Sequence, residues 1–246
     1  MTLVDYDAEA EAYDRTRGGE PRAEAAAAAV HALLPATART LLDLACGTGI
    51  VTARLGRPGL RVLGADPSYG MLRRAGARGV PVVLADGTRL PFAGGSLDAV
   101  SAVWLLHLLR EPGLLGAVVA EVARVLRPGG VFLATVDKDA AHDVGSDIDA
   151  VLAPHLTGDP ADAWADVVRA GVVCGLVPVG ETGFHGSGQG CSPREAAEAV
   201  RAGRYASRVR PRTSAAALAG ELESLPDPER RRGEPRYRLV AFRRTA

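Results

Sequence analysis

Five short, nearly continuous apolar stretches between residues 40 and 136 predict β-strands. They lie at 40–45, 61–66, 80–85, 97–103 and 130–136. Helical patterns lie between most of them, including a helix directly after the Gly-Thr-Gly turn that follows the first stretch. Apolar strands of this kind suit a parallel sheet that is covered on both faces. The alternation of strands and helices therefore predicts a doubly wound α/β fold.

Helical patterns also precede and follow this region. A helix is expected over 21–35, because Pro21 suits a first helical position and Pro35 ends the pattern. Helices are also expected over 113–126, 162–176, 192–204 and 214–225, and further strands over 177–184 and 237–244. Ser192, Pro193 and Glu195 have the spacing of a capped helix start.

Composition narrows the class of protein. The chain has 246 residues and is 47% hydrophobic, which is enough for a substantial core. Its formal net charge is zero, so no overall field attracts nucleic acid or an anionic membrane. No apolar run approaches the roughly 20 residues that span a bilayer, and the acidic N-terminus does not resemble a signal peptide. We therefore expect a cytoplasmic protein without nucleic-acid or membrane partners. The sequence does not indicate the oligomeric state.

The cysteines give no sign of a metal site or a disulfide framework. Cys46, Cys174 and Cys191 are far apart in the sequence and form no C-x-x-C pair. Cys46 lies inside the glycine turn, but no histidine is spaced to activate it as a nucleophile. We therefore interpret Cys46 as a small packing residue and expect no metal.

The glycine turn after the first strand raises the question of its ligand. Dinucleotide, nucleoside triphosphate and S-adenosylmethionine sites all begin with such a turn. A dinucleotide fingerprint continues with a third glycine, but Thr52 stands there after Gly47 and Gly49. A phosphate loop needs a lysine that is missing at this position. Both phosphate-binding interpretations are therefore weakened.

Three carboxylates stand at the ends of successive predicted strands, where open α/β sheets bind ligands. Asp43 would repel a pyrophosphate and favours a ligand with positive charge. Asp66 lies 17 residues beyond Gly49, near the spacing at which an acid accepts hydrogen bonds from ribose hydroxyls. Asp86 is placed to accept from an adenine amino group. This set favours S-adenosylmethionine, which carries an ammonium and a sulfonium but no phosphate.

With these motifs in place, the chain resembles a class I S-adenosylmethionine-dependent methyltransferase of the small-molecule type. "LLDLACGTG" resembles the first motif of that family and "VLGADPSYGML" its ribose-binding second motif. "VVLADGTRLPFAGGSLDAVSAVWLLHLL" and "EVARVLRPGGVFLATV" resemble the later motifs, and "YDRTRGG" is a weaker upstream match. The resemblance covers residues 40–136.

The resemblance implies a Rossmann-like sheet of seven strands in the order 3-2-1-4-5-7-6, with strand 7 antiparallel. "YRLVAFRR" fits strand 7. Two expected helices separate strands 6 and 7, which are usually a near-continuous hairpin in the family, so we expect a helical insertion that covers the substrate. We expect one methyltransferase domain over 1–246, with a helical cap (1–35), a cofactor-binding core (36–136) and a substrate-side segment with the final strands (137–246).

The site residues follow from the strand ends and the resemblance together. In the family an N-terminal aromatic segment often folds over the cofactor and an arginine pairs with its carboxylate, which implies Tyr13 and Arg17. The complete set expected to bind S-adenosylmethionine is Tyr13, Arg17, Asp43, Ala45, Gly47, Gly49, Asp66, Met71, Asp86, Gly87 and Val103.

The candidate catalytic residue is His107. It follows the fourth strand at the expected mouth of the site and could take a proton from the acceptor. The alternative is a histidine packed against Trp104, because proximity and orientation alone can drive methyl transfer. Asp137 and Lys138 near the same mouth, and His185 in a glycine-rich stretch, are weaker candidates.

The expected function is S-adenosylmethionine-dependent methyl transfer to an O, N or C nucleophile of a small molecule, with secondary metabolism as one setting. Two alternatives stay open. On this fold the bound cofactor can serve a cyclisation or rearrangement without reacting, because fold does not fix chemistry. The chain can also be a cofactor-binding module without catalysis. The sequence does not identify the acceptor.

Overall fold

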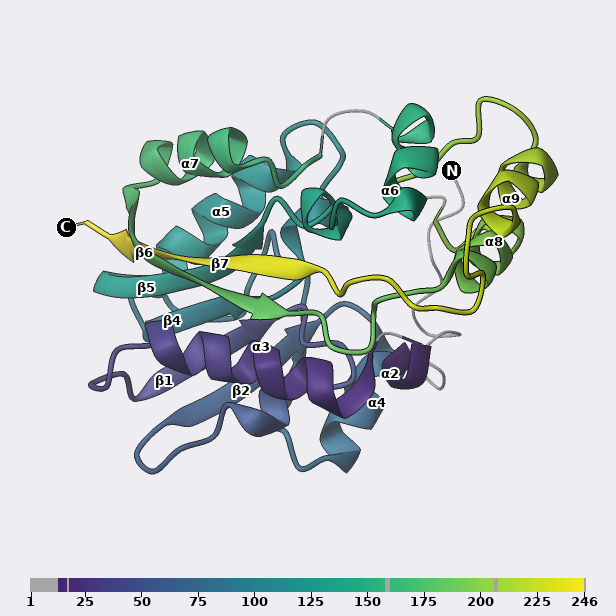
Figure 1. Ribbon diagram of the computed structural model, residues 1–246. Coiled ribbons are helices and arrows are strands. Elements are labelled where there is room, and N and C mark those ends of the chain that lie inside the picture. Colours follow the sequence, from purple (N-terminus) through teal and green to yellow (C-terminus); the bar gives the residue numbers. More distant parts are fainter. Residues whose placement is uncertain (1–12, 17, 158–159, 206–207, 246) are drawn as a thin grey trace.

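The computed structural model describes residues 13–16, 18–157, 160–205 and 208–245. In this part of the chain seven strands form one sheet in the order β3-β2-β1-β4-β5-β7-β6 (Figure 1). Strands β1 to β5 pair in parallel, and β7 is antiparallel to both β5 and β6. The predicted α/β fold, strand order and antiparallel seventh strand are confirmed. The strands are β1 (Thr40–Leu44), β2 (Arg61–Asp66), β3 (Val82–Leu84), β4 (Leu97–Ala102), β5 (Leu126–Val136), β6 (Leu176–His185) and β7 (Arg236–Arg244).

Helices cover both faces of the sheet, which is why its strands are apolar on both sides (Figure 1). Leu42 and Leu44 of β1 belong to a core with α5 and α7, whereas Leu41 belongs to the opposite core with α3. The α-helices are α2 (Tyr13–Thr16), α3 (Gly19–Leu33), α4 (Tyr69–Ala77), α5 (Leu114–Val125), α6 (Asp147–Leu152), α7 (Trp164–Val173), α8 (Pro193–Arg201) and α9 (Ala215–Glu223). Short 3-10 helices are η1 (Thr52–Arg54), η2 (Leu106–Leu108), η3 (Ala140–His142) and η4 (Ala153–His155).

The prediction of a helix directly after the glycine turn is wrong. Only the single 3-10 turn η1 forms there. The run 50–52 consists of β-branched residues, which disfavour a helix, and Gly56 and Pro58 end any helical path soon afterwards. The chain therefore crosses from β1 to β2 by a compact loop.

Strand β5 begins at Leu126, earlier than the expected start at residue 130. Leu97 pairs with Leu126, but Ala99 pairs with Val131, so the extra residues of "RPGG" bulge out of the ladder. The glycines permit this bulge without ending the strand.

Helices α6, α8 and α9 form a helical lobe at one end of the molecule, beyond the start of β7 (Figure 1). The lobe has its own apolar core, in which Ile148 and Leu152 of α6 pack with residues of α8 and α9. The predicted insertion between β6 and β7 is thus confirmed, since α8 and α9 lie there. Helix α6 was not expected, although the capping box of Ser146 and Asp149 marks its start. Among the described residues, no helix combines the length and apolar character that crossing a bilayer requires.

Candidate functional site

A cleft of about 960 Å³, including its solvent-open mouth, lies at the carboxyl ends of β1, β2 and β4. Most of the sequence-predicted cofactor residues line it. Those residues are Tyr13, Asp43, Ala45, Gly47, Asp66, Met71 and Val103. The tertiary structure therefore brings together residues from α2, β1, β2, α4 and β4.

The glycine turn exposes its backbone because several of its residues adopt left-handed conformations. The φ angles are 57° at Ala45, 54° at Gly47 and 73° at Gly49. Glycine takes such angles without steric cost, whereas alanine does so only under strain. Strained backbone of this kind is often found where a ligand binds. Ala45, Cys46 and Gly47 all line the cleft, so the turn itself faces it.

Asp66 organises the turn between β2 and α4. Its Oδ2 accepts from the backbone N–H of Gly47 at 2.9 Å, and its Oδ1 accepts from the backbone N–H of Ser68 at 2.9 Å. Ser68 in turn caps α4 by accepting from the N–H of Met71. One carboxylate at the end of β2 therefore holds the glycine turn and the start of α4 in fixed positions. Carboxylates keep further acceptor capacity for a ligand after two such bonds.

Asp43 lies beneath the turn and is 3% exposed. Its Oδ2 accepts from the Thr52 hydroxyl at 2.6 Å, and its Oδ1 accepts from the Ser101 hydroxyl at 2.8 Å. Burial raises the pKa of Asp43 to about 6, although both hydroxyl bonds work in the opposite direction. Thr52 is the residue that breaks the dinucleotide fingerprint, and its hydroxyl holds this acid instead.

Three of the predicted cofactor residues do not line the cleft. Gly49 packs against α4, where a Cβ would lie 2.7 Å from the Cβ of Ala75, so its observed role is close packing. Asp86 is exposed and accepts from the backbone and hydroxyl of Thr88. Gly87 lies beside Val118. Their contact with a cofactor remains a prediction, and Arg17 lies outside the described residues.

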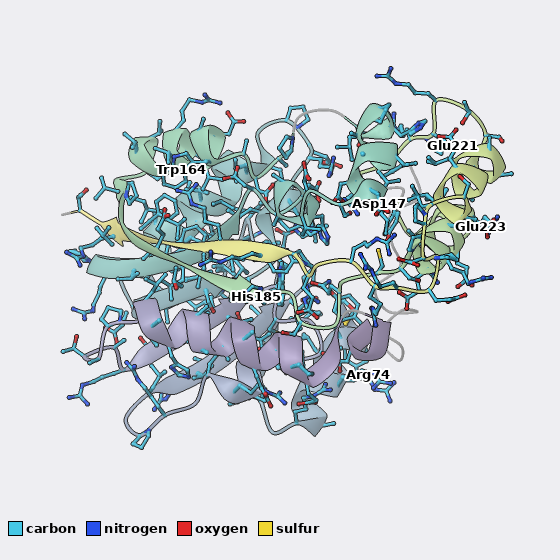
Figure 2. All side chains as sticks on the ribbon, viewed as in Figure 1. Arg74, Asp147, Trp164, His185, Glu221 and Glu223 are labelled. Atoms are coloured by element: carbon cyan, nitrogen blue, oxygen red, sulfur yellow. The ribbon has the colours of Figure 1, made fainter. Side chains whose placement is uncertain are left out.

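The predicted catalytic residue His107 is buried on η2. Its neighbours Leu105 and Leu108 line the cleft, but His107 does not. Its catalytic role remains a prediction. His185 ends β6 as an exposed side chain (Figure 2).

Cys46 behaves as a packing residue. It is buried, and its Sγ occupies the space next to Gly64, where a Cβ would lie only 2.6 Å away. Burial raises the pKa of the Cys46 thiol, and the carboxylates Asp43 and Asp66 raise it further. A protonated thiol is a poor nucleophile.

Sequence reasoning did not place Arg22 or Trp104 in the cleft. The guanidinium carbon of Arg22 on α3 lies 3.4 Å from the centroid of the Trp104 ring, and both side chains line the cleft. Trp104 has a φ of 60°, and its backbone N–H donates to the Thr135 hydroxyl at 2.8 Å. An arginine in an alanine-rich helix gave no signal, because only the folded chain brings it to the end of β4.

Sequence reasoning also missed Asp14 of α2. Its carboxylate accepts from the Thr48 hydroxyl at 2.6 Å and forms an ion pair with Arg78. These contacts attach α2 to the glycine turn, and Tyr13 consequently lines the cleft.

Comparison with known proteins agrees with this architecture. Residues 42–134 match the family model described as a methyltransferase domain. This match covers less than half of the chain, and the observed strand order is the one expected for a class I methyltransferase fold.

Part of the chain is also similar to demethylmenaquinone methyltransferases. The protein of Corynebacterium kroppenstedtii is 43% identical over 96 residues, which cover 39% of this chain and 41% of that protein. The protein of Mycolicibacterium vanbaalenii is 46% identical over 90 residues, 37% of this chain and 38% of that protein. The chain thus matches about two fifths of the length of these relatives.

Solved structures share the whole fold at low identity. A methyltransferase in complex with the Haloferax volcanii Trm112 activator has a TM-score of 0.62 at 17% identity, over 100% of both chains. The cyclase SpnF has a TM-score of 0.62 at 18% identity, over 98% of this chain and 94% of that one. Similarity at this level concerns the fold and not the reaction.

Proposed function

We propose that the protein transfers the methyl group of S-adenosylmethionine to a nucleophilic atom of a small molecule. The observation that carries the proposal is the pair of buried acids, Asp43 and Asp66, around a glycine turn that lacks phosphate-binding features. A negative cleft of this kind favours a cationic adenosyl compound over a dinucleotide. The match of residues 42–134 to the methyltransferase domain supports the same conclusion.

The residues of the cleft fit the chemistry of this cofactor. Asp66 would accept from the ribose hydroxyls, and the backbone of Ala45 and Gly47 would contact the methionine part. Asp43, which the hydroxyls of Thr52 and Ser101 hold in place, would supply negative charge near the cationic centre. Met71, which is 2% exposed, would provide an apolar surface for the adenine ring.

When bound, the cofactor supplies an electrophilic methyl group on a sulfonium. Attack in line requires that the protein align the acceptor and exclude water. Trp104, Leu105 and Leu108 form an apolar side of the cleft suited to both tasks. His107 is the proposed residue to take a proton from the acceptor, because it lies between Leu105 and Leu108, which line this apolar side of the cleft.

The acceptor is proposed only as a small molecule. The demethylmenaquinone methyltransferases match only about two fifths of this chain and of their own length, so the substrate in their name is not carried over. The lobe of α6, α8 and α9 and the segment after β5 would complete the acceptor pocket.

Isothermal titration calorimetry with S-adenosylmethionine, S-adenosylhomocysteine and NAD tests this function. We expect binding of the first two compounds and none of NAD. Mass spectrometry of products from an acceptor panel then separates the reactions, because methyl transfer adds one CH2 and a rearrangement gives an isomer. Tight binding of NAD would contradict the proposal.

The affinity for S-adenosylmethionine is expected to fall as the pH drops through 6. Burial raises the pKa of Asp43 to about 6, so this acid loses its charge below that pH and no longer attracts a cation. Between pH 7.5 and pH 5 we expect the dissociation constant to rise about tenfold, one order of magnitude per pH unit below the pKa. Calorimetry at a series of pH values measures this change.

The matched variant is Asp43→Asn. It should bind more weakly at pH 7.5 and show little change down to pH 5. A variant with the same pH profile as the unaltered protein would show that another group titrates.

A further inference from the structure

The indole N–H of Trp104 is a hydrogen-bond donor without an acceptor in the described part of the chain. Trp104 lies two residues after the end of β4 and lines the cleft. Its Nε1 atom is buried, and the described residues offer it no hydrogen-bond partner. An indole N–H can only donate, and a buried donor that is left unpaired is energetically costly. A ligand that brings an acceptor atom would remove this cost.

The backbone at Trp104 is also held in an unfavourable conformation. Its φ of 60° lies in the left-handed region, which a bulky side chain rarely adopts. The backbone N–H donates to the hydroxyl of Thr135 on β5 at 2.8 Å, and Thr135 is buried. This bond maintains the strained conformation and fixes where the side chain leaves the backbone. Strain that the surrounding structure maintains in this way is typical of ligand sites.

Three side chains pack against the Trp104 ring. The guanidinium carbon of Arg22 lies 3.4 Å from the ring centroid. The rings of Phe184 and Tyr237 make edge contacts with it, at centroid distances of 5.7 Å and 5.6 Å. Because Phe184 and Tyr237 are both buried, they leave the Trp104 ring little freedom to turn its N–H toward another part of the protein.

Tyr237 is itself fixed by polar contacts. Its hydroxyl donates to Gln189 Oε1 at 2.6 Å and lies 3.3 Å from His142 Nε2. The rings of Tyr237 and His142 also make an edge contact at 5.8 Å. The hydroxyl next to the Trp104 ring is therefore engaged with these two side chains and not with the indole N–H.

A ligand can approach the Trp104 ring from the cleft. Of the three side chains that pack against the ring, only Arg22 lines the cleft. An arginine side chain is long and has many rotamers, so Arg22 can move away from the ring when a ligand enters. Leu105 and Leu108 continue the lining next to Trp104, so the surroundings of the N–H on this side are apolar.

We propose that the indole N–H of Trp104 donates to an oxygen atom of the methyl acceptor after Arg22 has moved from the ring. The inference rests on the proposed function and names its substrate class: a molecule with an apolar body and a hydrogen-bond-accepting oxygen, such as a ketone. The body contacts Leu105 and Leu108, and the oxygen lies at Trp104. This bond orients the acceptor toward the methyl donor. It also discriminates against analogues that lack the oxygen, because they leave the donor unpaired.

The two tryptophans of the chain, Trp104 and Trp164, make the proposal directly testable. Labelling of the indole nitrogens with ¹⁵N gives one NMR signal for each, and Trp164→Phe assigns them. Trp164 lies on α7 and is not a lining residue of the cleft (Figure 2). The full-length protein is saturated with S-adenosylhomocysteine and titrated separately with acetophenone and α-methylstyrene. These two probes have nearly the same shape, but only acetophenone carries an accepting oxygen.

We expect acetophenone to move the indole proton of Trp104 downfield and to leave the signal of Trp164 unchanged. Its dissociation constant should be about tenfold below that of α-methylstyrene. Trp104→Phe keeps an aromatic ring and removes the N–H, so the two probes should bind to it about equally, as measured by ligand-observed NMR. Trp164→Phe is the matched control, which removes the same group from α7 and should keep the tenfold preference.

Equal binding of the two probes to the unaltered protein would overturn the proposal, and so would a Trp104 signal that acetophenone does not move. Both measurements use the unaltered protein, so they decide the question even if Trp104→Phe does not fold. A folded Trp104→Phe variant that keeps the preference for acetophenone would also overturn it. Calorimetry with S-adenosylhomocysteine on the same sample separates this inference from the proposed function. If that compound binds and acetophenone leaves the Trp104 signal in place, only this inference fails; if it does not bind, the proposed function itself fails.

Discussion

Replacement of Asp66 by asparagine is expected to weaken the binding of S-adenosylmethionine about 100-fold. The Asp66 carboxylate accepts from the backbone N–H groups of Gly47 and Ser68, and it would accept from the ribose of the cofactor as well. An asparagine has one oxygen for these two backbone donors, so its NH2 group faces an N–H group. Charge-assisted bonds contribute about 1.5–3 kcal/mol each, and the loss of one or two corresponds to that change in affinity.

Calorimetry with S-adenosylmethionine and S-adenosylhomocysteine at pH 7.5 measures this effect. Asp166→Asn on α7 is the matched control, because Asp166 pairs with Arg169 on the outside of the molecule. Helix α7, with the labelled Trp164, lies at the other end of the molecule from the lobe residues Asp147 and Glu223 (Figure 2). The control should bind as the unaltered protein does. An Asp66→Asn protein that keeps its affinity within threefold would remove Asp66 from the proposed site.

Replacement of Gly49 by alanine is expected to lower the free energy of unfolding by about 3 kcal/mol. The φ angle of 73° costs an alanine about 1–2 kcal/mol. The new Cβ would also lie 2.7 Å from the Cβ and 2.9 Å from the Cα of Ala75, which is too close for side-chain adjustment alone. Overpacking of this kind costs about 1–3 kcal/mol more. Urea denaturation without ligand measures the sum.

Gly47→Ala separates the two causes. Gly47 has a φ of 54°, but a Cβ there has no atom within 4 Å. Only the cost of the left-handed backbone remains, so the free energy of unfolding should fall by about 1–2 kcal/mol. Equal losses in the two variants would show that contact with Ala75 is not what restricts position 49.

Much of the fold follows from local pattern. The apolar runs that become β1, β2 and β4 are short and flanked by turns, and Leu41 and Leu42 enter opposite cores because successive side chains of a strand point to opposite faces. Ser192 and Glu195 form the predicted capping box of α8. The prediction of a helix after the glycine turn is wrong. The β-branched residues there disfavour a helix, and Gly56 and Pro58 end any helical path soon afterwards.

The candidate site was predictable only where chemistry and strand ends coincide. Asp43, Gly47 and Asp66 line the cleft because parallel strands end at a common edge. Asp86 follows the same rule, but its side chain accepts from Thr88 and is exposed. A sequence rule places a residue at an edge and does not decide which neighbour its side chain meets.

The sequence by itself determined the class of fold, the strand order through its resemblance to a family, and two acids, Asp43 and Asp66, that line the cleft. These features depend on residues close together in the chain, where periodicity and turn chemistry act. Only the tertiary structure decided that Arg22, Trp104, His142 and Tyr237 share one cluster. Their ring contacts join segments more than thirty residues apart in the chain, so no local pattern in the sequence could predict them.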